Sequence, residues 1–400
     1  MSLIDKLSDA EAWQDYLRYK ASRGNLTQAQ LEDLTQFVTE GQYRNAATRV
    51  QNGEAFAVPA KKLVSKANST KKRALYVFPR EENYLLKLLT FLAIREYDHV
   101  FSPNLYSFRA RTDSKRAIMS LVRQPGINEM YSYKVDVSDY FGSVDIDLLL
   151  PKLKGVVTGD PDLYAFLERL LTDDRVAVGN QIVREGKGIM AGSAISTFLA
   201  NVYLSELDHA FDNLPYPYAR YSDDIIAFAP TLEEAQQCES VIKDALDARN
   251  LGVNPAKEMR TAPHEQWTFL GICYQDGIVD IAPVSAKKLK DKMRRKSRSL
   301  LRWRARNGHQ YEHAAKAFVR SLNRKLYEGT KSSDLTWARW FFPLINTDKT
   351  LHEIDAYMQD CLRYVATGKR TKARFNFRYE DMKRLGYRSL VNEFYKGRDS

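Results

Sequence analysis

The sequence predicts an α+β protein with more than one domain, and three observations lead to this prediction. Short runs typical of strands flank residues 221–224, and another lies at 131–137. Apolar residues spaced three and four apart, which are typical of helices, recur on both sides of this central part. The 400 residues are enough for two or three domains with a sizeable core.

Helical spacing begins at the N-terminus and continues to about residue 56, which we interpret as a helical extension. A basic cluster follows, and the apolar run at 74–78 predicts a short strand that ends at Pro79. Leucines at helical spacing predict a helix over 82–96, and a shorter pattern predicts another over 114–123.

Residues 131–137 alternate between apolar and polar side chains, which predicts a half-buried strand with Asp136 at its end. Helical patterns are expected over 146–171 and, after a polar turn region with three glycines, over 193–211. A further helix is expected over 233–250, because Asn250 is followed by a glycine that favours a helix end.

The C-terminal part begins with short strands expected near 267–272 and 278–281. After residue 284 the pattern is that of helices with basic faces. Residues 286–400 carry 29 Lys and Arg against 12 Asp and Glu, a net charge of +17, whereas the remainder has a net charge of −6. This asymmetry predicts a surface that follows a phosphate backbone; a solvated helical face with a basic tail is the alternative.

Residues 217–229 predict a hairpin with Asp223 and Asp224 at its tip. Adjacent carboxylates repel each other, and a cation is the usual means of neutralising them. Asp136 lies 87 residues before Asp223 at the end of its own strand. If the three strands are neighbours, three carboxylates converge, the number that two Mg²⁺ ions need, with Mn²⁺ as the alternative. Taken singly, such aspartates are more often solvated turns or helix caps.

Composition also excludes some classes of protein. The chain has no run of about 18 apolar residues, so we expect no membrane span. Its first residues lack the apolar core of a signal peptide. The three cysteines lie far apart and form no CxxC pair, which predicts neither a disulfide framework nor a zinc site. A reducing cytosol suits this composition, so we expect a cytoplasmic protein.

Seven blocks of sequence occur in a characteristic order between about residues 60 and 285. They lie at 71–79, 97–109, 133–141, 188–204, 221–224, 251–257 and 269–271. In this order they resemble the fingers and palm motifs of bacterial reverse transcriptases, those related to group II introns and retrons. The resemblance implies a right-hand polymerase with fingers, a palm carrying an antiparallel sheet, and a helical thumb.

The same resemblance implies domain limits. The helical extension at 1–56 precedes fingers at 57–133 and a palm at 134–285, which contains a fingers segment at about 146–190. A basic helical thumb and a tail then occupy 286–400.

The resemblance also implies roles for single residues. Asp136, Asp223 and Asp224 match the metal-binding triad, and the backbone carbonyl of Val137 matches a further contact to the nucleotide metal. Phe141 matches the aromatic residue that packs under the sugar and excludes a 2′-hydroxyl. Deoxynucleotides are therefore the expected substrates. The alternative for Phe141 is a core residue beside a strand.

Basic residues match further positions of the family. Arg73, with Lys71 or Lys72, matches the fingers cations that hold the triphosphate. Arg109 matches an arginine that contacts the template or the incoming nucleotide. Lys257 matches the lysine that protonates the leaving pyrophosphate. A solvated surface role is the alternative for these positions.

The second palm motif departs from the family, because Met190-Ala191-Gly192 stands where Pro-Gln-Gly is usual. Ala191 has no side-chain amide for the nucleotide sugar or the template, whereas Gly192 still permits close backbone approach to the substrate. This departure implies a specialised polymerase with one preferred template.

The C-terminal quarter resembles a thumb followed by the tail of the "unknown group" reverse transcriptases associated with phage defence. Four arginines at helical spacing are expected to share one nucleic-acid-binding face, namely Arg294, Arg295, Arg298 and Arg302. We therefore expect an RNA-directed DNA polymerase that makes DNA from deoxynucleoside triphosphates on a dedicated, structured non-coding RNA in antiphage defence. Two alternatives stay open: a group II intron-type maturase, and an RNA-binding scaffold with a vestigial polymerase site.

Overall fold

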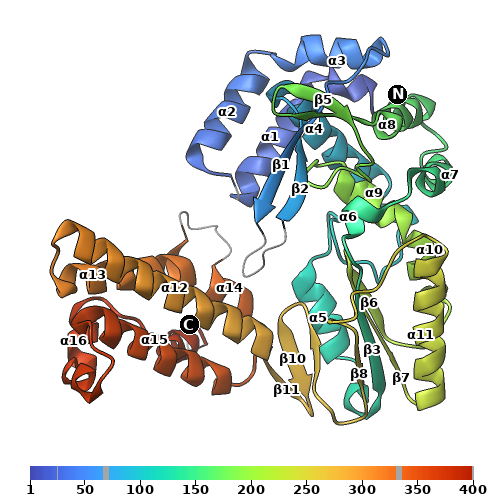
Figure 1. The fold of residues 1–400 in the computed structure, drawn as a ribbon. Coiled ribbons are helices and arrows are strands. Elements are labelled where there is room, and N and C mark those ends of the chain that lie inside the picture. Colours follow the sequence, from blue (N-terminus) through green and yellow to red (C-terminus); the bar gives the residue numbers. More distant parts are fainter. Residues whose placement is uncertain (25, 66–71, 330–335, 399–400) are drawn as a thin grey trace. The chain divides into compact units, whose positions relative to one another are not determined.

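The computed structural model describes residues 1–24, 26–65, 72–329 and 336–398. The chain divides into two compact units, Met1–Pro263 and His264–Ser400 (Figure 1). Within the described ranges, none of the helices combines the length and the apolar character that a membrane span requires. Mixed helix and sheet confirm the predicted α+β class.

The first unit begins with helices α1 (Ala10–Arg23), α2 (Gln28–Thr39) and α3 (Tyr43–Gln51), which confirm the helical pattern expected up to about residue 56. Their shared core is aromatic. Trp13 is fully buried, stacks on Tyr43 with ring centroids 4.9 Å apart and meets Phe37 edge-on. Helices α1 and α3 pack against α4 (Arg80–Glu96), the helix expected over 82–96.

A four-stranded sheet in the order β2-β1-β4-β5 follows. Its strands are β1 (Ala60–Ser65), β2 (Lys72–Val77), β4 (Arg175–Val178) and β5 (Gln181–Arg184). Strand β2 is the one expected at 74–78. Strand β1 and the β4–β5 hairpin were not predicted, because most of their side chains are exposed and lack the apolar alternation of half-buried strands.

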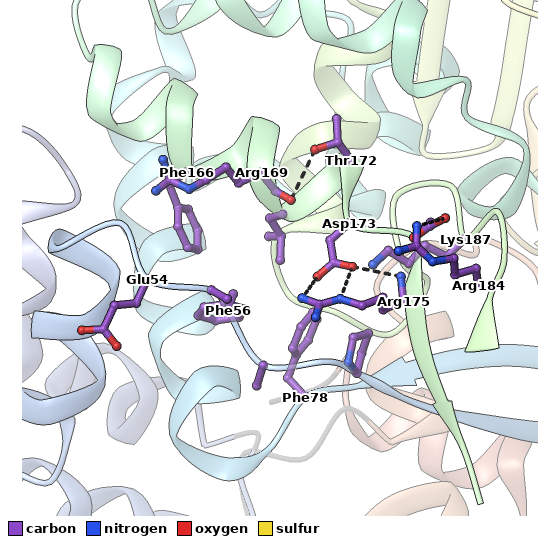
Figure 2. Close-up of a pocket in the computed structure, with 15 residues that line it drawn as sticks. Glu54, Phe56, Phe78, Phe166, Arg169, Thr172, Asp173, Arg175, Arg184 and Lys187 are labelled. Carbon is purple, nitrogen blue, oxygen red and sulfur yellow. Dashed lines mark hydrogen bonds and ion pairs between the residues drawn. The ribbon is translucent and has the colours of Figure 1, made fainter. Parts of the chain in front are cut away.

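A pocket of about 350 Å³ adjoins this sheet (Figure 2). The chain before β1, the end of α8 (Pro161–Thr172) and the β4–β5 hairpin enclose it. Together with α7 (Ile146–Val156), α8 confirms the helical pattern expected over 146–171.

The helix expected over 193–211 is interrupted and forms α9 (Ser196–Tyr203) and α10 (Ser205–Asp212). Backbone carbonyls near the junction accept hydrogen bonds from side chains of other segments. Arg220 Nη2 donates to the Asn201 carbonyl at 3.4 Å, and Arg249 Nε donates to the Tyr203 carbonyl at 3.0 Å. These bonds explain the break, since carbonyls that accept side-chain bonds contribute less to a regular helical ladder.

The central sheet has the order β6-β7-β3-β8, and its pairs are antiparallel. The strands are β3 (Tyr131–Asp136), β6 (Tyr218–Tyr221), β7 (Asp224–Ala229) and β8 (Met259–Thr261). Helix α11 (Leu232–Asp247) packs against β3 and β7, and α5 (Ser114–Val122) packs against β6 (Figure 1). The expected hairpin and the expected strand at 131–137 are therefore neighbours.

The second unit joins a small antiparallel sheet to helices. Its strands are β9 (Trp267–Phe269), β10 (Ile272–Gln275) and β11 (Ile278–Ile281). Its helices are α12 (Pro283–Asn307), α13 (Tyr311–Asn323), α14 (Trp337–Phe341), α15 (Lys349–Thr367), α16 (Tyr379–Arg384) and α17 (Leu390–Lys396). Helices α12, α13 and α15 pack on one another. The boundary between the two compact units lies at residues 263 and 264, whereas the resemblance implies a palm that ends at 285, so the small sheet belongs to the second unit. The functional domain limits stay predictions.

The C-terminal tail is held by one buried carboxylate. Asp355 of α15 accepts hydrogen bonds from Ser389 Oγ at 2.5 Å, from the backbone N–H of Leu390 at 2.8 Å and from Tyr387 Oη at 3.1 Å. Because Asp355 is buried and well bonded, it fixes the start of α17 against α15.

Candidate active site

The turn between β6 and β7 places the aspartate pair at the end of the central sheet. Tyr221 and Asp224 are paired in register, so Ser222 and Asp223 form a two-residue turn. Ser222 has a φ of +60°, the left-handed region that tight hairpin turns use. Asp223 is therefore at the tip, and Asp224 is the first residue of β7.

Asp136 lies directly opposite Asp224 across the β3–β7 pair. Residues directly opposite in an antiparallel pair project on the same face of the sheet. The backbone carbonyl of Asp223 accepts a hydrogen bond from the N–H of Val137 at 2.9 Å, which ties the hairpin tip to the end of β3. The backbone register thus places Asp136 opposite Asp224 and close to the turn that carries Asp223, and the joint role predicted for the three aspartates stays a prediction.

Two lysines neutralise only part of the negative charge of this acidic cluster. Lys257 Nζ lies 2.5 Å from Asp136 Oδ1, and Lys134 Nζ lies 3.1 Å from Asp224 Oδ1. Burial, and then the negative charge of Asp136, raises the pKa of Asp223 above its usual range. Burial also raises the pKa of Asp224, although Lys134 opposes that shift. The electrostatics of the cluster therefore favour binding of an additional cation.

The donor set suits a hard cation such as Mg²⁺, which prefers carboxylate oxygens. Asp224 Oδ1 is buried, and the Lys134 ammonium group 3.1 Å away makes no well-aligned hydrogen bond with it. Over the same residues, no group of three or more His, Cys, Asp and Glu side chains is arranged to hold a metal ion. The ammonium groups of Lys257 and Lys134 lie beside Asp136 and Asp224 instead, and the metal ligands stay a prediction.

Phe141 follows β3 in the short helix α6 (Tyr140–Ser143) and is half-buried. Its backbone carbonyl accepts a hydrogen bond from the N–H of Ile189 at 3.0 Å. A Cβ atom on Gly188 would lie 2.3 Å from that carbonyl oxygen, and Gly188 has a φ of +50°. Only glycine permits this approach, so the second palm motif fixes the backbone of Phe141.

The segment that departs from the family lies against strand β2. The carbonyl of Ala191 accepts a hydrogen bond from the N–H of Tyr76 at 2.8 Å. Gly192 has a φ of +101°, and a Cβ atom there would lie 3.3 Å from Leu75 Cβ. The close approach that Gly192 permits is thus made to β2 of the protein itself, and its predicted contact with substrate stays untested.

The predicted substrate cations differ in their surroundings. Lys71 lies outside the described residues, whereas Lys72 and Arg73 are exposed on β2. Arg109 is mostly buried and donates five hydrogen bonds, to both carboxylate oxygens of Asp98 and to backbone carbonyls including that of Ser102. These bonds use all the donors of a guanidinium group. The structure therefore favours a structural role for Arg109 over the predicted substrate contact.

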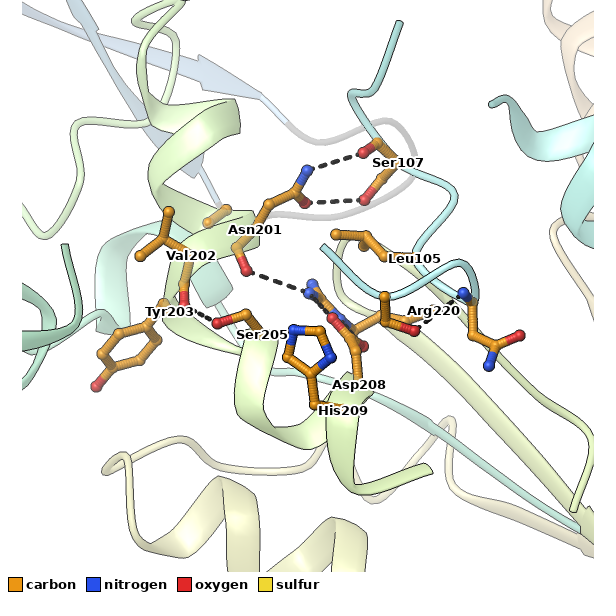
Figure 3. Close-up of polar contacts among 12 residues, drawn as sticks. Leu105, Ser107, Asn201, Val202, Tyr203, Ser205, Asp208, His209 and Arg220 are labelled. Carbon is orange, nitrogen blue, oxygen red and sulfur yellow. Dashed lines mark hydrogen bonds and ion pairs between the residues drawn. The ribbon is translucent and has the colours of Figure 1, made fainter. Parts of the chain in front are cut away.

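A buried ion pair beneath the hairpin was not predicted (Figure 3). Arg220 and Asp208 have fully buried side chains, and Arg220 donates to the carboxylate through Nε at 2.7 Å and Nη2 at 2.5 Å. Tyr218 Oη donates to the same carboxylate at 2.8 Å, and Arg220 Nη1 donates to the Ser222 carbonyl at 3.3 Å. Burial lowers the pKa of Arg220, but Asp208 raises it overall. An arginine within an apolar strand indicates a buried partner, yet sequence spacing does not identify it.

The second fingers block also supports this hairpin. The N–H of Tyr106 donates to the Arg220 carbonyl, and the N–H of Arg220 donates to the Asn104 carbonyl, both at 3.0 Å. The Asn201 side chain of α9 accepts a hydrogen bond from Ser107 Oγ and donates one to the Ser107 carbonyl, as Figure 3 shows. Residues from two of the matched blocks therefore meet Arg220 behind the aspartates.

The four predicted nucleic-acid-binding arginines are exposed on α12 in the second unit. At about 100° per residue, Arg294, Arg295, Arg298 and Arg302 span an arc of roughly 100° on the helix. The buried stripe of α12 lies on the other side, centred at Met293. Arg294 and Arg298 also line a pocket of about 300 Å³, to which the chain after α15 adds Lys369, Arg370 and Arg374. The four arginines thus lie on one side of α12, and the nucleic-acid-binding role expected for them stays a prediction.

Known proteins resemble about half of this chain in sequence. The family model described as "Reverse transcriptase (RNA-dependent DNA polymerase)" matches residues 64–274. The group II intron-encoded protein LtrA of Lactococcus lactis subsp. cremoris is 22% identical over 216 residues, which are 53% of this chain and 35% of that protein. The chain thus spans about a third of the length of that curated relative.

Solved telomerases show a weaker likeness. The apo telomerase of Candida tropicalis has a TM-score of 0.47 and 12% identity, covering 83% of this chain and 69% of that one. The telomerase of Candida albicans, solved with a fragment of telomeric RNA, has a TM-score of 0.46 and 12% identity, covering 88% and 68%. Scores below 0.5 do not establish a shared fold, so the family match carries the assignment.

Proposed function

The chain belongs to the reverse transcriptase (RNA-dependent DNA polymerase) family, and we propose that it copies RNA into DNA by extending the 3′-hydroxyl of a primer with deoxynucleotides. One observation carries this proposal. Asp136 and Asp224 face each other across β3 and β7, and Asp223 lies at the adjoining turn. Three carboxylates at one end of a sheet are the donor set that phosphoryl transfer with two Mg²⁺ ions, or Mn²⁺ in their place, requires.

The chain's own residues have distinct parts in this proposal. Two bound Mg²⁺ ions supply activation of the primer hydroxyl and neutralisation of the triphosphate. The carboxylates of Asp136, Asp223 and Asp224 would hold these ions at the end of the sheet. Lys257, already beside Asp136, donates a proton to the leaving pyrophosphate. Arg73, exposed on β2, binds the triphosphate together with Lys71 or Lys72.

Sugar selection follows from the position of Phe141. Its backbone is fixed by Ile189 and Gly188, so its ring has little freedom to retreat. Its ring lies edge-on to Phe108, with centroids 6.4 Å apart, and Phe108 also contacts Tyr221 of the hairpin. In this proposal the ring packs under the sugar and excludes a 2′-hydroxyl, so deoxynucleotides are the substrates.

We further propose a dedicated, structured non-coding RNA as template and a role in antiphage defence. Support comes from the tail, which resembles defence-associated enzymes, and from Ala191, which replaces the usual glutamine. The exposed arginine face of α12 suits a phosphate backbone. The similarity to a group II intron-encoded protein favours an intron-type maturase as the second candidate. An RNA-binding scaffold with a vestigial site is the third, and Ala191 is the observation that favours it.

One experiment separates these candidates. Purified protein with its copurified RNA is incubated with labelled deoxynucleotides and Mg²⁺. We expect incorporation that EDTA abolishes and that the Asp223→Ala, Asp224→Ala variant loses, because cation ligands at a turn are removed while the fold persists. The matched control is Asp244→Ala, Asp247→Ala, two exposed aspartates of α11.

Synthesis retained by the hairpin variant contradicts the site assignment, and no synthesis by the wild type favours the scaffold. Sequencing the copurified RNA tests the template proposal. One recurrent structured RNA supports a dedicated template, intron RNA supports the maturase, and a random population contradicts both.

A further inference from the structure

A buried lysine without a partner lies in the wall of the pocket beside the first sheet. Lys187 is only 5% exposed, and its ammonium group makes no hydrogen bond or ion pair with any residue the structure describes. Burial lowers the pKa of Lys187, while the carboxylates of Asp173 and Asp174 act against this shift. A buried ammonium group is costly unless an anion neutralises it.

The carboxylates near Lys187 are already engaged. Asp173 accepts hydrogen bonds from Arg175 through Nε at 3.0 Å and Nη2 at 2.8 Å. Asp174 lies 3.2 Å from Arg184 Nη1. Each acidic residue thus has its own arginine, and the charge of Lys187 is left without a dedicated counter-ion.

The opposite part of the pocket is aromatic. The ring of Phe56 lies 5.4 Å from that of Phe78 and 5.3 Å from that of Phe166. Figure 2 shows Phe56 and Phe166 on one side of the view and Lys187 on the other. The pocket therefore offers apolar ring faces and a lysine that has no hydrogen-bond or ion-pair partner among the described residues, within about 350 Å³, the lower end of the size range of small-molecule sites.

We propose that this pocket binds a nucleoside phosphate, with the phosphate on the Lys187 ammonium group and the base against Phe56 and Phe166. A planar base matches the ring faces, and a phosphate matches the buried cation. The ligand is either a free nucleotide or one nucleotide of a strand. The described residues that line the pocket include none of the predicted catalytic or substrate-binding residues, so the site is separate from the aspartate cluster.

The pocket adjoins the segment that fixes Phe141. The carbonyl of Lys187 accepts a hydrogen bond from the N–H of Met190 at 3.0 Å, and the N–H of Ile189 donates to the Phe141 carbonyl. A ligand on Lys187 therefore contacts the start of the same turn that positions Phe141.

The test uses the full chain carrying Asp223→Ala and Asp224→Ala, in EDTA, so that nucleotide binding at the aspartate cluster is suppressed. The probes are inorganic phosphate, AMP and a 5′-phosphorylated trinucleotide, each titrated by calorimetry. We expect saturable binding of AMP or the trinucleotide at one site per chain, weakened about 10- to 100-fold by adding Lys187→Met. Lys154→Met, an exposed lysine of α7 outside the pocket, is the matched control.

The melting temperature shows whether Lys187 is structural instead. Removal of an uncompensated buried charge is expected to leave the melting temperature of ligand-free protein unchanged or higher. Phe56→Ala, at a half-buried position, supplies a second variant that is expected to weaken AMP binding but not phosphate binding.

The outcomes decide the proposal and the source of the ligand. Tighter binding of AMP than of the trinucleotide identifies a free nucleotide, and the reverse identifies a strand. The proposal is overturned if none of the three probes binds saturably. It is also overturned if the Lys187→Met variant binds AMP and the trinucleotide with the same affinity as its parent. If inorganic phosphate binds as tightly as AMP, the proposed contact of the base with Phe56 and Phe166 is wrong. Because the parent lacks the aspartate pair, none of these results depends on polymerase activity.

Discussion

The buried pair of Arg220 and Asp208 makes the hairpin sensitive to a change far from any substrate. Replacing Asp208 with leucine removes the acceptor of two arginine hydrogen bonds, at 2.7 and 2.5 Å, and of one from Tyr218. Arg220 then keeps a charge in a fully buried position, with weaker bonds to the carbonyls of Asn201 and Ser222.

The expected cost follows from this geometry. Leaving one partner of a buried ion pair uncompensated lowers the free energy of unfolding by about 3–5 kcal/mol. Replacing Arg220 with methionine as well removes the stranded charge, so the double variant is expected to be more stable than the sum of the two single effects predicts. We expect a coupling free energy of about 2–3 kcal/mol between the two positions.

Urea unfolding followed by circular dichroism measures the free energies of the wild type, the two single variants and the double variant. Hydrogen exchange of the amides of β6 and β7 locates the loss at the hairpin. Single effects that add to within about 0.5 kcal/mol refute the reasoning, because residues that neutralise each other cannot contribute independently. Exchange that changes only outside the first unit also refutes it.

Further predictions concern the sugar, the turn that fixes Phe141, and the basic helix. Phe141→Val is expected to admit ribonucleotides by opening space for the 2′-hydroxyl; equal ribonucleotide use by variant and wild type in a primer-extension assay would show Phe141 to be only a core residue. Gly188→Ala is expected to lower the melting temperature more than Gly179→Ala, because both glycines have positive φ but only Gly188 lies against a backbone carbonyl. Similar melting temperatures contradict that overlap. Removing Arg294, Arg295, Arg298 and Arg302 is expected to flatten the salt dependence of RNA binding by about 0.9 unit for each phosphate that these arginines neutralise. In filter binding at several salt concentrations, an unchanged slope supports a solvated face, and removing Arg18, Arg23, Arg44 and Arg49 is the charge-matched control.

Several residues show where prediction from sequence stops. Arg109 matched a substrate-binding position, but its five hydrogen bonds to Asp98 and nearby carbonyls depend on how one loop closes on itself. Lys187 is an ordinary lysine in sequence and becomes a candidate ligand site only because the fold buries it without a partner among the described residues. Strand β1 escaped prediction because its exposed, basic residues share no apolar alternation.

The sequence by itself determined the local features of this protein. Period-two runs on both sides of residues 221–224 specify a hairpin with Asp223 at its tip, helical spacing specifies most of the helices, and the order of motifs identifies the family. Such features depend on residues a few positions apart, so they can be read from the chain directly.

Only the tertiary structure decided which distant residues meet. The pairing of β3 with β7 places Asp136 opposite Asp224, and a register shift by one residue would turn these side chains to opposite faces of the sheet. Likewise, Arg220 pairs with Asp208 because α10, which carries Asp208, packs behind the hairpin beside Arg220. Register and burial depend on packing between segments far apart in sequence, and local periodicity carries no information about that packing.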